Sequence, residues 1–227
     1  MPISLASLSQ LLAERFSEQA RSRRYLTIAV SGDGALGKST FCALVGQRNP
    51  KIRTLSIDGY IPSRAQRGLQ QIPLGDEMAD YAAVRRAVAS FKAGEGISNL
   101  RSYDHLSGQP ADLGRSIDAD TNILLIDGGL ASIYLPQNLI DYYVLFDAPD
   151  DVRRMVRMEV DVSRGYTTEQ FEINWKAYLS IYRRTIATQR RAANVIACLT
   201  EHRLYNLIDA RGGFRHQTEL GKPFLMT

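Results

Sequence analysis

The chain has 227 residues, of which 44% are hydrophobic and 23% charged, proportions typical of one globular domain or of one domain with a small insertion. Its net charge of +4 comes with neither a basic arm nor a module that interleaves basic and aromatic residues, so we expect no nucleic-acid partner. No apolar run approaches the roughly 20 residues of a membrane span, and charged residues interrupt the N-terminal segment, so neither a membrane partner nor a signal peptide is expected. Cys42 and Cys198 lack disulfide or metal spacing, which favours free thiols in a cytoplasmic protein.

Apolar periodicity predicts a first helix over residues 3–20, within an N-terminal helical segment 1–24. A β-branched run at 25–30 then predicts a buried strand, followed by a glycine-rich segment and a helix over 40–47. The later elements alternate in the same way: strands at 55–57, 123–126, 142–146 and 195–197, and helices at 79–93, 151–162 and 168–191. Continuous apolar strands alternating with helices predict an α/β fold of three layers with a central parallel sheet. With no repeats and no long linker, 1–227 is expected to be a single domain that ends in an unplaced tail, 211–227.

The segment between the first strand and the second helix matches the complete phosphate-binding pattern Gly32-x4-Gly37-Lys38-Ser39, also called Walker A or P-loop. Glycines let the backbone N–H groups surround a phosphate, and the helix that follows adds its positive N-terminal end. Lys38 is expected to reach the β- and γ-phosphates of ATP, and the Ser39 hydroxyl to bind Mg²⁺. The predicted nucleotide contacts from this loop are Gly32, Asp33, Gly34, Ala35, Leu36, Gly37, Lys38, Ser39 and Thr40.

Two aspartates follow strands whose carboxyl ends should open on the same crevice as this loop. Asp127 ends the third buried strand, where a carboxylate can act on Mg²⁺ through water, although strand-end Asp-Gly pairs also form ordinary turns. Asp58 ends the second strand, where it could accept a proton from an attacking hydroxyl, with a buried turn aspartate as the alternative.

An arginine stripe is predicted on the helix that follows the fourth strand. Arg153, Arg157 and Arg164 fall within roughly 40° of one another at about 100° per residue, provided that the helix continues that far. Such a stripe can clamp phosphate oxygens as a lid closes, and the alternative is a solvated basic face. Arg157 and Arg164 are therefore candidate catalytic residues and Arg153 a candidate nucleotide contact, in a lid over 150–166.

In their order and spacing these features resemble the uridine kinase, phosphoribulokinase and bacterial pantothenate kinase family, over roughly residues 28–196. After the P-loop, the landmarks that carry the resemblance are Ser56-Ile57-Asp58-Gly59-Tyr60, Arg64, Arg67-Gly68, Asp76-Glu77-Met78-Ala79-Asp80, Tyr103-Asp104-His105, Asp127-Gly128, and Asp150-Asp151-Val152-Arg153 with Arg157, Asp161 and Arg164-Gly165. Departures from the family pattern are Asp127 in place of glutamate and no clear counterpart of the basic residue after Tyr-Asp.

The resemblance implies a sheet of strand order 2-3-1-4-5 with a helical lid, and transfer of the γ-phosphate of ATP, with Mg²⁺, to a hydroxyl of a small-molecule acceptor. That acceptor would be a nucleoside, a sugar or a pantothenate-like alcohol. Asp58 would be the general base, and a homo-oligomer would be in keeping with the family. The acceptor contacts implied, or suggested by position, are Tyr60, Arg64, Asp80, Tyr103 and His105.

Other classes of nucleotide-binding protein fit less well. A GTPase switch would need an Asn-Lys-x-Asp run, which the chain lacks, and a transport ATPase would need a glutamate where Gly128 stands. A catalytically degenerate, regulatory or interaction protein of the same fold stays open as an alternative. Trp175, Tyr178 and Tyr182 occur at core spacing on one helix and are expected to pack in the interior.

Overall fold

A computed structural model of the protein describes residues 1–70 and 79–210. Asp76, Glu77, Met78 and the tail 211–227 lie outside the described residues. The helices are α1 (Leu5–Ala20), α2 (Lys38–Arg48), α3 (Arg64–Gln70), α4 (Tyr81–Ala93), α5 (Ala131–Tyr134), α6 (Asp150–Ser163) and α7 (Thr168–Ala192), with 3₁₀ turns η1 (Ile57–Tyr60) and η2 (Gln137–Leu139). The strands are β1 (Leu26–Gly32), β2 (Ile52–Ser56), β3 (Arg101–Asp104), β4 (Gln109–Asp112), β5 (Ile123–Asp127), β6 (Tyr142–Asp147), β7 (Val195–Leu199) and β8 (Tyr205–Asp209).

The main sheet has the order β2-β5-β1-β6-β7-β8, and its first five strands are parallel. The predicted order 2-3-1-4-5 is therefore confirmed, because β5, β6 and β7 are the third, fourth and fifth predicted strands. The antiparallel edge strand β8 was not predicted. β1, β5 and β6 are buried along their whole length, which explains their unbroken apolar sequences.

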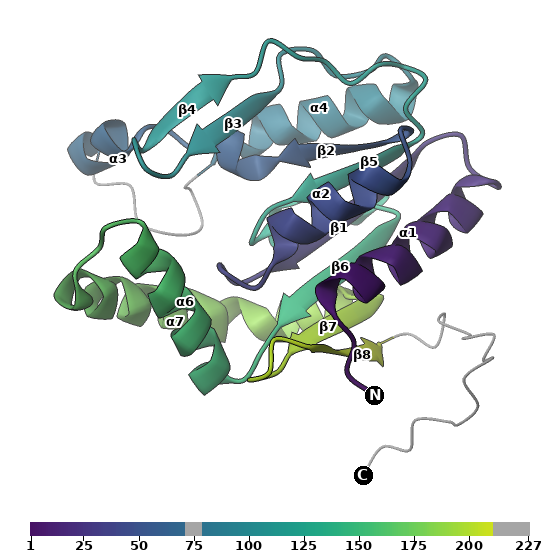
Figure 1. Ribbon diagram of the computed structural model, residues 1–227. Helices are drawn as coiled ribbons and strands as arrows, with labels where there is room; N and C mark the ends of the chain where they lie inside the picture. Colours follow the sequence, from purple (N-terminus) through teal and green to yellow (C-terminus); the bar gives the residue numbers. More distant parts are fainter. Residues whose placement is uncertain (71–78, 211–227) are drawn as a thin grey trace.

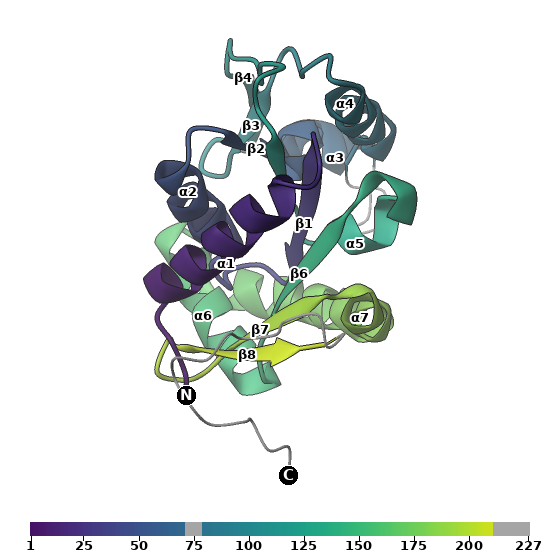
Figure 2. The ribbon, with the colours of Figure 1, turned by 90° about the vertical axis from the view of Figure 1, so that its right-hand side faces the viewer.

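Helices cover both faces of this sheet and so complete the three predicted layers (Figures 1 and 2). α1, α2 and α6 bury their apolar side chains against one face, in a cluster that includes Phe16, Phe41 and Val152. α4 and α5 pack on the opposite face, in a cluster that includes Val88, Phe91 and Ala131. Within the described part of the chain, no helix is both long and apolar enough to cross a membrane.

A two-stranded hairpin, β3–β4, forms outside the main sheet and was not predicted from the sequence. Its side chains are largely exposed and polar, so the apolar alternation that would have revealed it is missing. The hairpin lies tightly against η1, because a Cβ at Gly59 would be only 2.4 Å from the Arg101 carbonyl oxygen. It therefore stands beside the carboxyl end of β2 (Figure 1).

Asp141, just before β6, joins the start of β1 to α4. Its carboxylate accepts hydrogen bonds from the Thr27 backbone N–H (2.9 Å) and hydroxyl (2.8 Å), and pairs with Arg23 (2.7 Å) and Lys92 (3.1 Å). Burial alone would raise the pKa of Asp141, but the Thr27 and Lys92 hydrogen bonds outweigh it and hold the pKa below its usual value. The ionised carboxylate therefore stabilises the folded state.

Replacing Asp141 by asparagine should lower the free energy of unfolding at pH 7 by about 1 to 3 kcal/mol, because charge-assisted hydrogen bonds are lost. Since the folded pKa lies below the unfolded value of about 3.9, this stabilisation is complete above that pH and is lost as the pH falls through the folded pKa. Urea unfolding of wild type and Asp141→Asn from pH 7 to pH 3 measures the difference. Asp120→Asn, at an exposed loop position, is the control; a gap of constant size at every pH would contradict the assignment.

Candidate functional site

The P-loop joins β1 to α2 at the centre of the sheet, and its shape depends on backbone freedom at its first glycine. Gly32 has φ = 123°, and a Cβ there would lie 2.0 Å from the Phe146 carbonyl oxygen of the neighbouring strand, so only glycine fits. Gly37, with φ = 87°, precedes the first turn of α2 and directs the helix N-terminus into the loop. The loop therefore presents backbone N–H groups and a positive helix end to one space, as phosphate binding requires.

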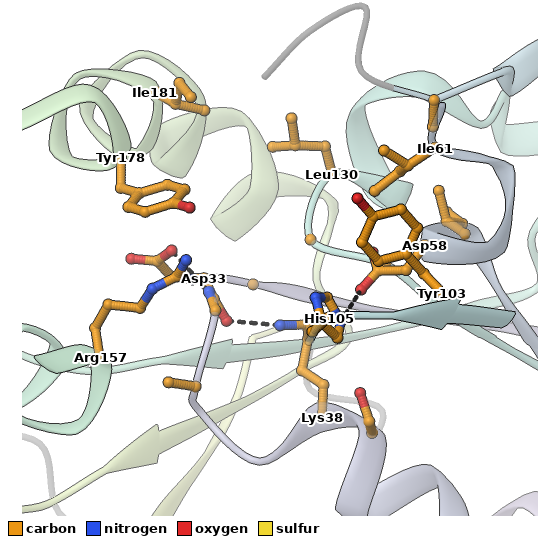
Figure 3. Close-up of a pocket in the computed structure, with 18 of the residues that line it drawn as sticks. Asp33, Lys38, Asp58, Ile61, Tyr103, His105, Leu130, Arg157, Tyr178 and Ile181 are labelled. Carbon is orange, nitrogen blue, oxygen red and sulfur yellow. Dashed lines mark hydrogen bonds and ion pairs between the residues drawn. The ribbon is translucent and has the colours of Figure 1, made fainter. Parts of the chain in front are cut away.

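A pocket of about 450 Å³ opens at the carboxyl ends of the central strands (Figure 3). At this end of the sheet, α6 and α7 lie on one side, and α3 with β3–β4 lies on the other (Figure 1). Elements distant in the sequence contribute to its walls. The predicted site residues that line it are Gly32, Asp33, Gly34, Ala35, Lys38, Ser39, Asp58, Arg64, Tyr103, His105, Asp127, Arg157 and Arg164.

Lys38, Ser39 and Asp127 meet at the bottom of this pocket. Asp127 is in register with Val30 of β1, and its carboxylate accepts a hydrogen bond from the Ser39 hydroxyl. Burial raises the pKa of Asp127, and the nearby Asp58 charge adds to this, whereas Lys38 and Ser39 oppose it. The Lys38 ammonium donates to the Asp33 carbonyl oxygen at 2.6 Å (Figure 3).

This donor set fits Mg²⁺. A hydroxyl and one carboxylate suit an ion that keeps several waters and takes its other ligands from phosphate oxygens. The raised pKa of Asp127 fits as well, since a dication at that place would supply the charge that favours the ionised carboxylate. The described residues contain no cluster of three or more His, Cys, Asp or Glu that could hold a metal ion.

Asp58 lies in η1, directly after β2, and faces the hairpin. Its Oδ2 is 3.3 Å from Nε2 of His105 (Figure 3). Burial would raise the pKa of Asp58, but the His105 hydrogen bond and the charges of His105, Lys38 and Arg164 lower it below its usual value. Asp58 is thus an ionised carboxylate at neutral pH, with its side chain 42% exposed and open to the pocket.

The side of the pocket on which the acceptor contacts were predicted is built by α3 and the hairpin. Arg64 donates to the His105 carbonyl oxygen (2.8 Å), and its side chain lies flush against Gly108, where a Cβ would be 3.0 Å from the guanidinium carbon. Arg67 donates to the Tyr103 hydroxyl (2.8 Å), which in turn donates to the Gly108 carbonyl oxygen (3.0 Å). These contacts fix Tyr103 and His105 beside Asp58.

Two arginines of the predicted stripe line the pocket: Arg157 lies on α6, and Arg164 is the residue at the C-terminal end of this helix. Arg157 bonds Asp161 at 3.1 Å and stacks on the Tyr178 ring at 3.9 Å. Its Nη1 approaches Gly34 so closely that a Cβ there would lie 1.9 Å away, so α6 touches the P-loop through this side chain. Arg164, the residue after the last turn of α6, makes no side-chain hydrogen bond or ion pair with the described residues.

Arg153 does not line the pocket, in contrast to its expected role as a nucleotide contact. Its side chain is 1% exposed and lies 3.3 Å from the Tyr182 ring centroid. It pairs with Asp33 of the P-loop at 3.0 Å and with Asp150 at 2.5 Å. The helix period correctly predicted the face of α6 on which Arg153 lies. At the position of Arg153, however, this face is covered by α7.

Five further predicted residues are also absent from the pocket lining. Asp80 caps α4 by accepting from the Ala83 backbone N–H (2.9 Å), and Tyr60 packs against the apolar cluster under α4. Leu36 is buried beneath the P-loop, Gly37 contacts Tyr205, and Thr40 is an exposed residue of α2. Asp80 and Tyr60, which were predicted to contact the acceptor, thus have local structural roles.

Sequence reasoning missed the contribution of α7. Tyr178 and Tyr182, expected in the core, line the pocket, whereas Trp175 is buried as expected. Helical spacing could not distinguish a core residue from a pocket-lining residue here. The same inner face of α7 packs in the core along one part of the helix and lines the pocket along another. The other lining residues not predicted as site residues include Arg67, Tyr81, Leu130, Asp161, Tyr166, Asn174, Ile181, Thr185 and Gln189.

Replacing Arg153 by methionine should lower the free energy of unfolding by about 3 to 5 kcal/mol, because Asp33 and Asp150 lose a buried partner. The double variant Arg153→Met/Asp33→Asn should recover part of this loss, since one unpaired charge is removed. Urea denaturation provides the measurement. The adjacent Arg154, exposed and paired with Glu172, is the matched control, and Arg154→Met should cost less than about 1 kcal/mol. Equal losses at the two positions would contradict the structural role of Arg153.

Comparisons with known proteins agree with this architecture at the level of fold. No protein-family model and no curated protein sequence matches the chain. Among solved structures, D-glycerate 3-kinase from Cryptococcus neoformans var. grubii aligns with a TM-score of 0.70 and 13% identity, over 89% of this chain and 99% of that chain. A protein from Silicibacter sp. TM1040, provisionally described as a fructose transport system kinase, aligns with a TM-score of 0.58 and 17% identity, over 83% and 93%. A protein from Bacillus stearothermophilus described as a possible uridine kinase aligns with a TM-score of 0.50 and 18% identity, over 82% and 98%. The chain therefore has the fold of the P-loop kinases.

Proposed function

We propose that the protein is an ATP-dependent kinase that transfers the γ-phosphoryl group to a hydroxyl of a small-molecule acceptor. One observation carries the proposal: an ionised carboxylate, Asp58, opens into the same pocket as a complete P-loop with Lys38, Ser39 and Asp127. The kinase fold of the structural neighbours supports it, as does the acceptor chemistry in the names of the glycerate and uridine kinases.

On the nucleotide side, the P-loop N–H groups and Lys38 hold the β- and γ-phosphates. Ser39, with Asp127 acting through water, would hold Mg²⁺, which when bound neutralises phosphate charge and orients the γ-phosphoryl group. Lys38 would exchange its bond to the Asp33 carbonyl oxygen for phosphate oxygens. Arg157, already touching the P-loop at Gly34, and Arg164 supply positive charge where negative charge develops during transfer.

On the acceptor side, Asp58 accepts the proton of the attacking hydroxyl. The hydroxyl oxygen forms a bond to the γ-phosphorus as the bond from that phosphorus to the β,γ-bridging oxygen breaks, and ADP leaves. Because its pKa is lowered, Asp58 is ready to accept a hydrogen bond throughout the neutral range. His105, bonded to Asp58, holds the carboxylate in position.

Asp58→Asn should keep nucleotide binding and reduce phosphoryl transfer by about 10²- to 10⁴-fold, since asparagine holds the hydrogen-bond geometry but accepts no proton. ADP formation with Mg²⁺ is measured against an acceptor panel of uridine, cytidine, glycerate, pantothenate, ribulose 5-phosphate and simple sugars. A fluorescent ATP analogue reports binding separately. Unchanged transfer would remove Asp58 from the role of base.

Lys38→Ala should weaken nucleotide binding and also lower the rate of transfer by about 100-fold or more, because a charge on the transferring group is no longer stabilised. Binding and turnover are measured as for Asp58. The exposed Lys51, at the start of β2 and outside the pocket, provides the control Lys51→Ala. If wild type binds ATP but no acceptor on the panel raises ADP formation above the rate of the protein alone, the degenerate, regulatory alternative replaces the kinase.

A further inference from the structure

Three aromatic side chains pack together behind the P-loop, outside the pocket lining. Phe41 of α2, Phe146 of β6 and Tyr205 of β8 are buried, and the ring centroids lie 5.3 Å apart for Phe41 and Phe146 and 5.6 Å apart for Phe146 and Tyr205. The first end of the loop rests on this group, because the Phe146 carbonyl oxygen lies against Gly32. Of the three side chains, only that of Tyr205 has a polar atom, and this atom contacts the other end of the loop.

The Tyr205 hydroxyl donates a hydrogen bond to the Leu36 carbonyl oxygen at 3.0 Å. It also lies so close to the next residue that a Cβ at Gly37 would be 2.6 Å from the hydroxyl oxygen. Among the described residues, Tyr205 is the one hydrogen-bond donor to the Leu36 carbonyl oxygen. Burial raises the pKa of Tyr205 to about 12, so the hydroxyl stays protonated and able to donate throughout the neutral range.

This hydrogen bond fixes the direction of one backbone donor of the P-loop. In a trans peptide the C=O and N–H groups point in opposite directions, and the described residues contain no cis peptide. With its carbonyl oxygen held by Tyr205, the peptide between Leu36 and Gly37 directs the Gly37 N–H away from the aromatic group and into the loop. In the described part of the chain this N–H has no hydrogen-bond acceptor, so it is available to a phosphate oxygen.

Lys38 spans the loop through its bond to the Asp33 carbonyl oxygen, and Gly37 does not line the pocket in this arrangement. In the proposed function Lys38 leaves that oxygen for the phosphates of ATP, which would open the loop to them. The Gly37 N–H would then act together with the N–H groups at the start of α2.

Tyr205 is itself held from both sides of its strand. β8 pairs with β7 over its whole length. On the other side, the Tyr205 backbone exchanges two hydrogen bonds with Ile3, at 2.8 and 3.0 Å. Because its backbone and its ring are both fixed, the Tyr205 hydroxyl can set the position of the peptide group that it binds.

We propose that Tyr205 is a positioning residue of the nucleotide site, whose hydroxyl holds the peptide between Leu36 and Gly37 so that the Gly37 N–H donates to the phosphates of ATP. The inference rests on the nucleotide binding within the proposed function. It extends the site to a residue that supports the phosphate loop without touching the ligand.

Tyr205→Phe removes the hydroxyl and keeps the ring in the aromatic group. With the full-length protein, Kd for the fluorescent ATP analogue and KM for ATP should each rise about 3- to 10-fold, because one N–H donor loses its fixed orientation. The value of kcat should stay nearly unchanged, since the contact is made in the ground state and in the transition state alike. Inorganic tripolyphosphate, measured by competition with the analogue, should lose affinity by the same factor, because the contact is to phosphate.

Tyr142→Phe is the matched control. Tyr142 is a buried tyrosine of the same apolar cluster, burial raises its pKa to about 12, and its ring packs edge-on against Phe16 as Tyr205 packs against Phe146. It lies at the start of β6, whereas the P-loop is reached at the other end of that strand, where Phe146 is in register with Gly32. Its substitution should therefore leave both Kd and KM unchanged.

Unchanged binding of the analogue by Tyr205→Phe would overturn the inference and leave the kinase proposal intact. The same holds for an equal loss in Tyr142→Phe, for a loss confined to kcat, and for a loss that spares tripolyphosphate. If wild type binds no nucleotide, the proposed function and this inference fall together. Circular dichroism establishes that the variants are folded.

Amide NMR of the wild type tests the Gly37 contact without any substitution. The Gly37 N–H resonance should move downfield when ATP is added, because the N–H gains a charged acceptor. A Gly37 resonance that stays in place while the protein binds ATP would contradict the inference, whatever the behaviour of the variant.

Discussion

The buried ion pair between Arg153 of α6 and Asp33 of the P-loop is the contact on which the arrangement of this site depends. It joins α6 to the loop at 3.0 Å, in a place where Arg153 is almost fully enclosed by Asp150 and the rings of α7. An aspartate within a phosphate loop would repel phosphate if it were unpaired, and Arg153 cancels that charge. The pair therefore contributes both to the packing of α6 and to the electrostatics of the loop.

α7 also combines packing with charged contacts, and its inner face changes from buried to pocket-lining along the helix. Trp175 is buried near Arg153, and Tyr182 contacts Arg153 while its hydroxyl donates to Asp147 at 2.9 Å. Arg190 completes this chain with a bond of 2.6 Å to the same carboxylate. Contacts between charged side chains, with the uncharged Tyr182 in the middle, thus run from the end of β6 to the P-loop, so a change in one member should alter the electrostatics of the loop.

Opposite α6 and α7, the hairpin and α3 build the other side of the pocket, the proposed acceptor side, from short polar segments. These segments lack a large apolar core of their own. They are fixed by hydrogen bonds from Arg64 to His105, from Arg67 to Tyr103, and from Tyr103 to Gly108. Segments of this kind can differ between proteins of one fold without loss of the central sheet. In agreement with this, solved structures that are 13% to 18% identical to this chain share its fold, while their names refer to different acceptors.

The sequence alone determined the parallel sheet, the position of the P-loop, and the two strand-end aspartates, because buried strands and phosphate loops impose local patterns that do not depend on distant residues. The strand order came from the resemblance to a known kinase family and not from such patterns. It also placed Arg157 and Arg164 at the pocket through helical spacing. Only the tertiary structure decided that Arg153 is buried behind the loop, that Asp80 caps a helix, and that Tyr178 faces the pocket. Spacing gives the direction of a side chain around its own helix, whereas its role depends on which other element covers that direction. Asp58 is a further example. The sequence predicted its position at the end of a strand, but not its partner His105, because the hairpin that carries His105 has no apolar alternation from which it could be predicted.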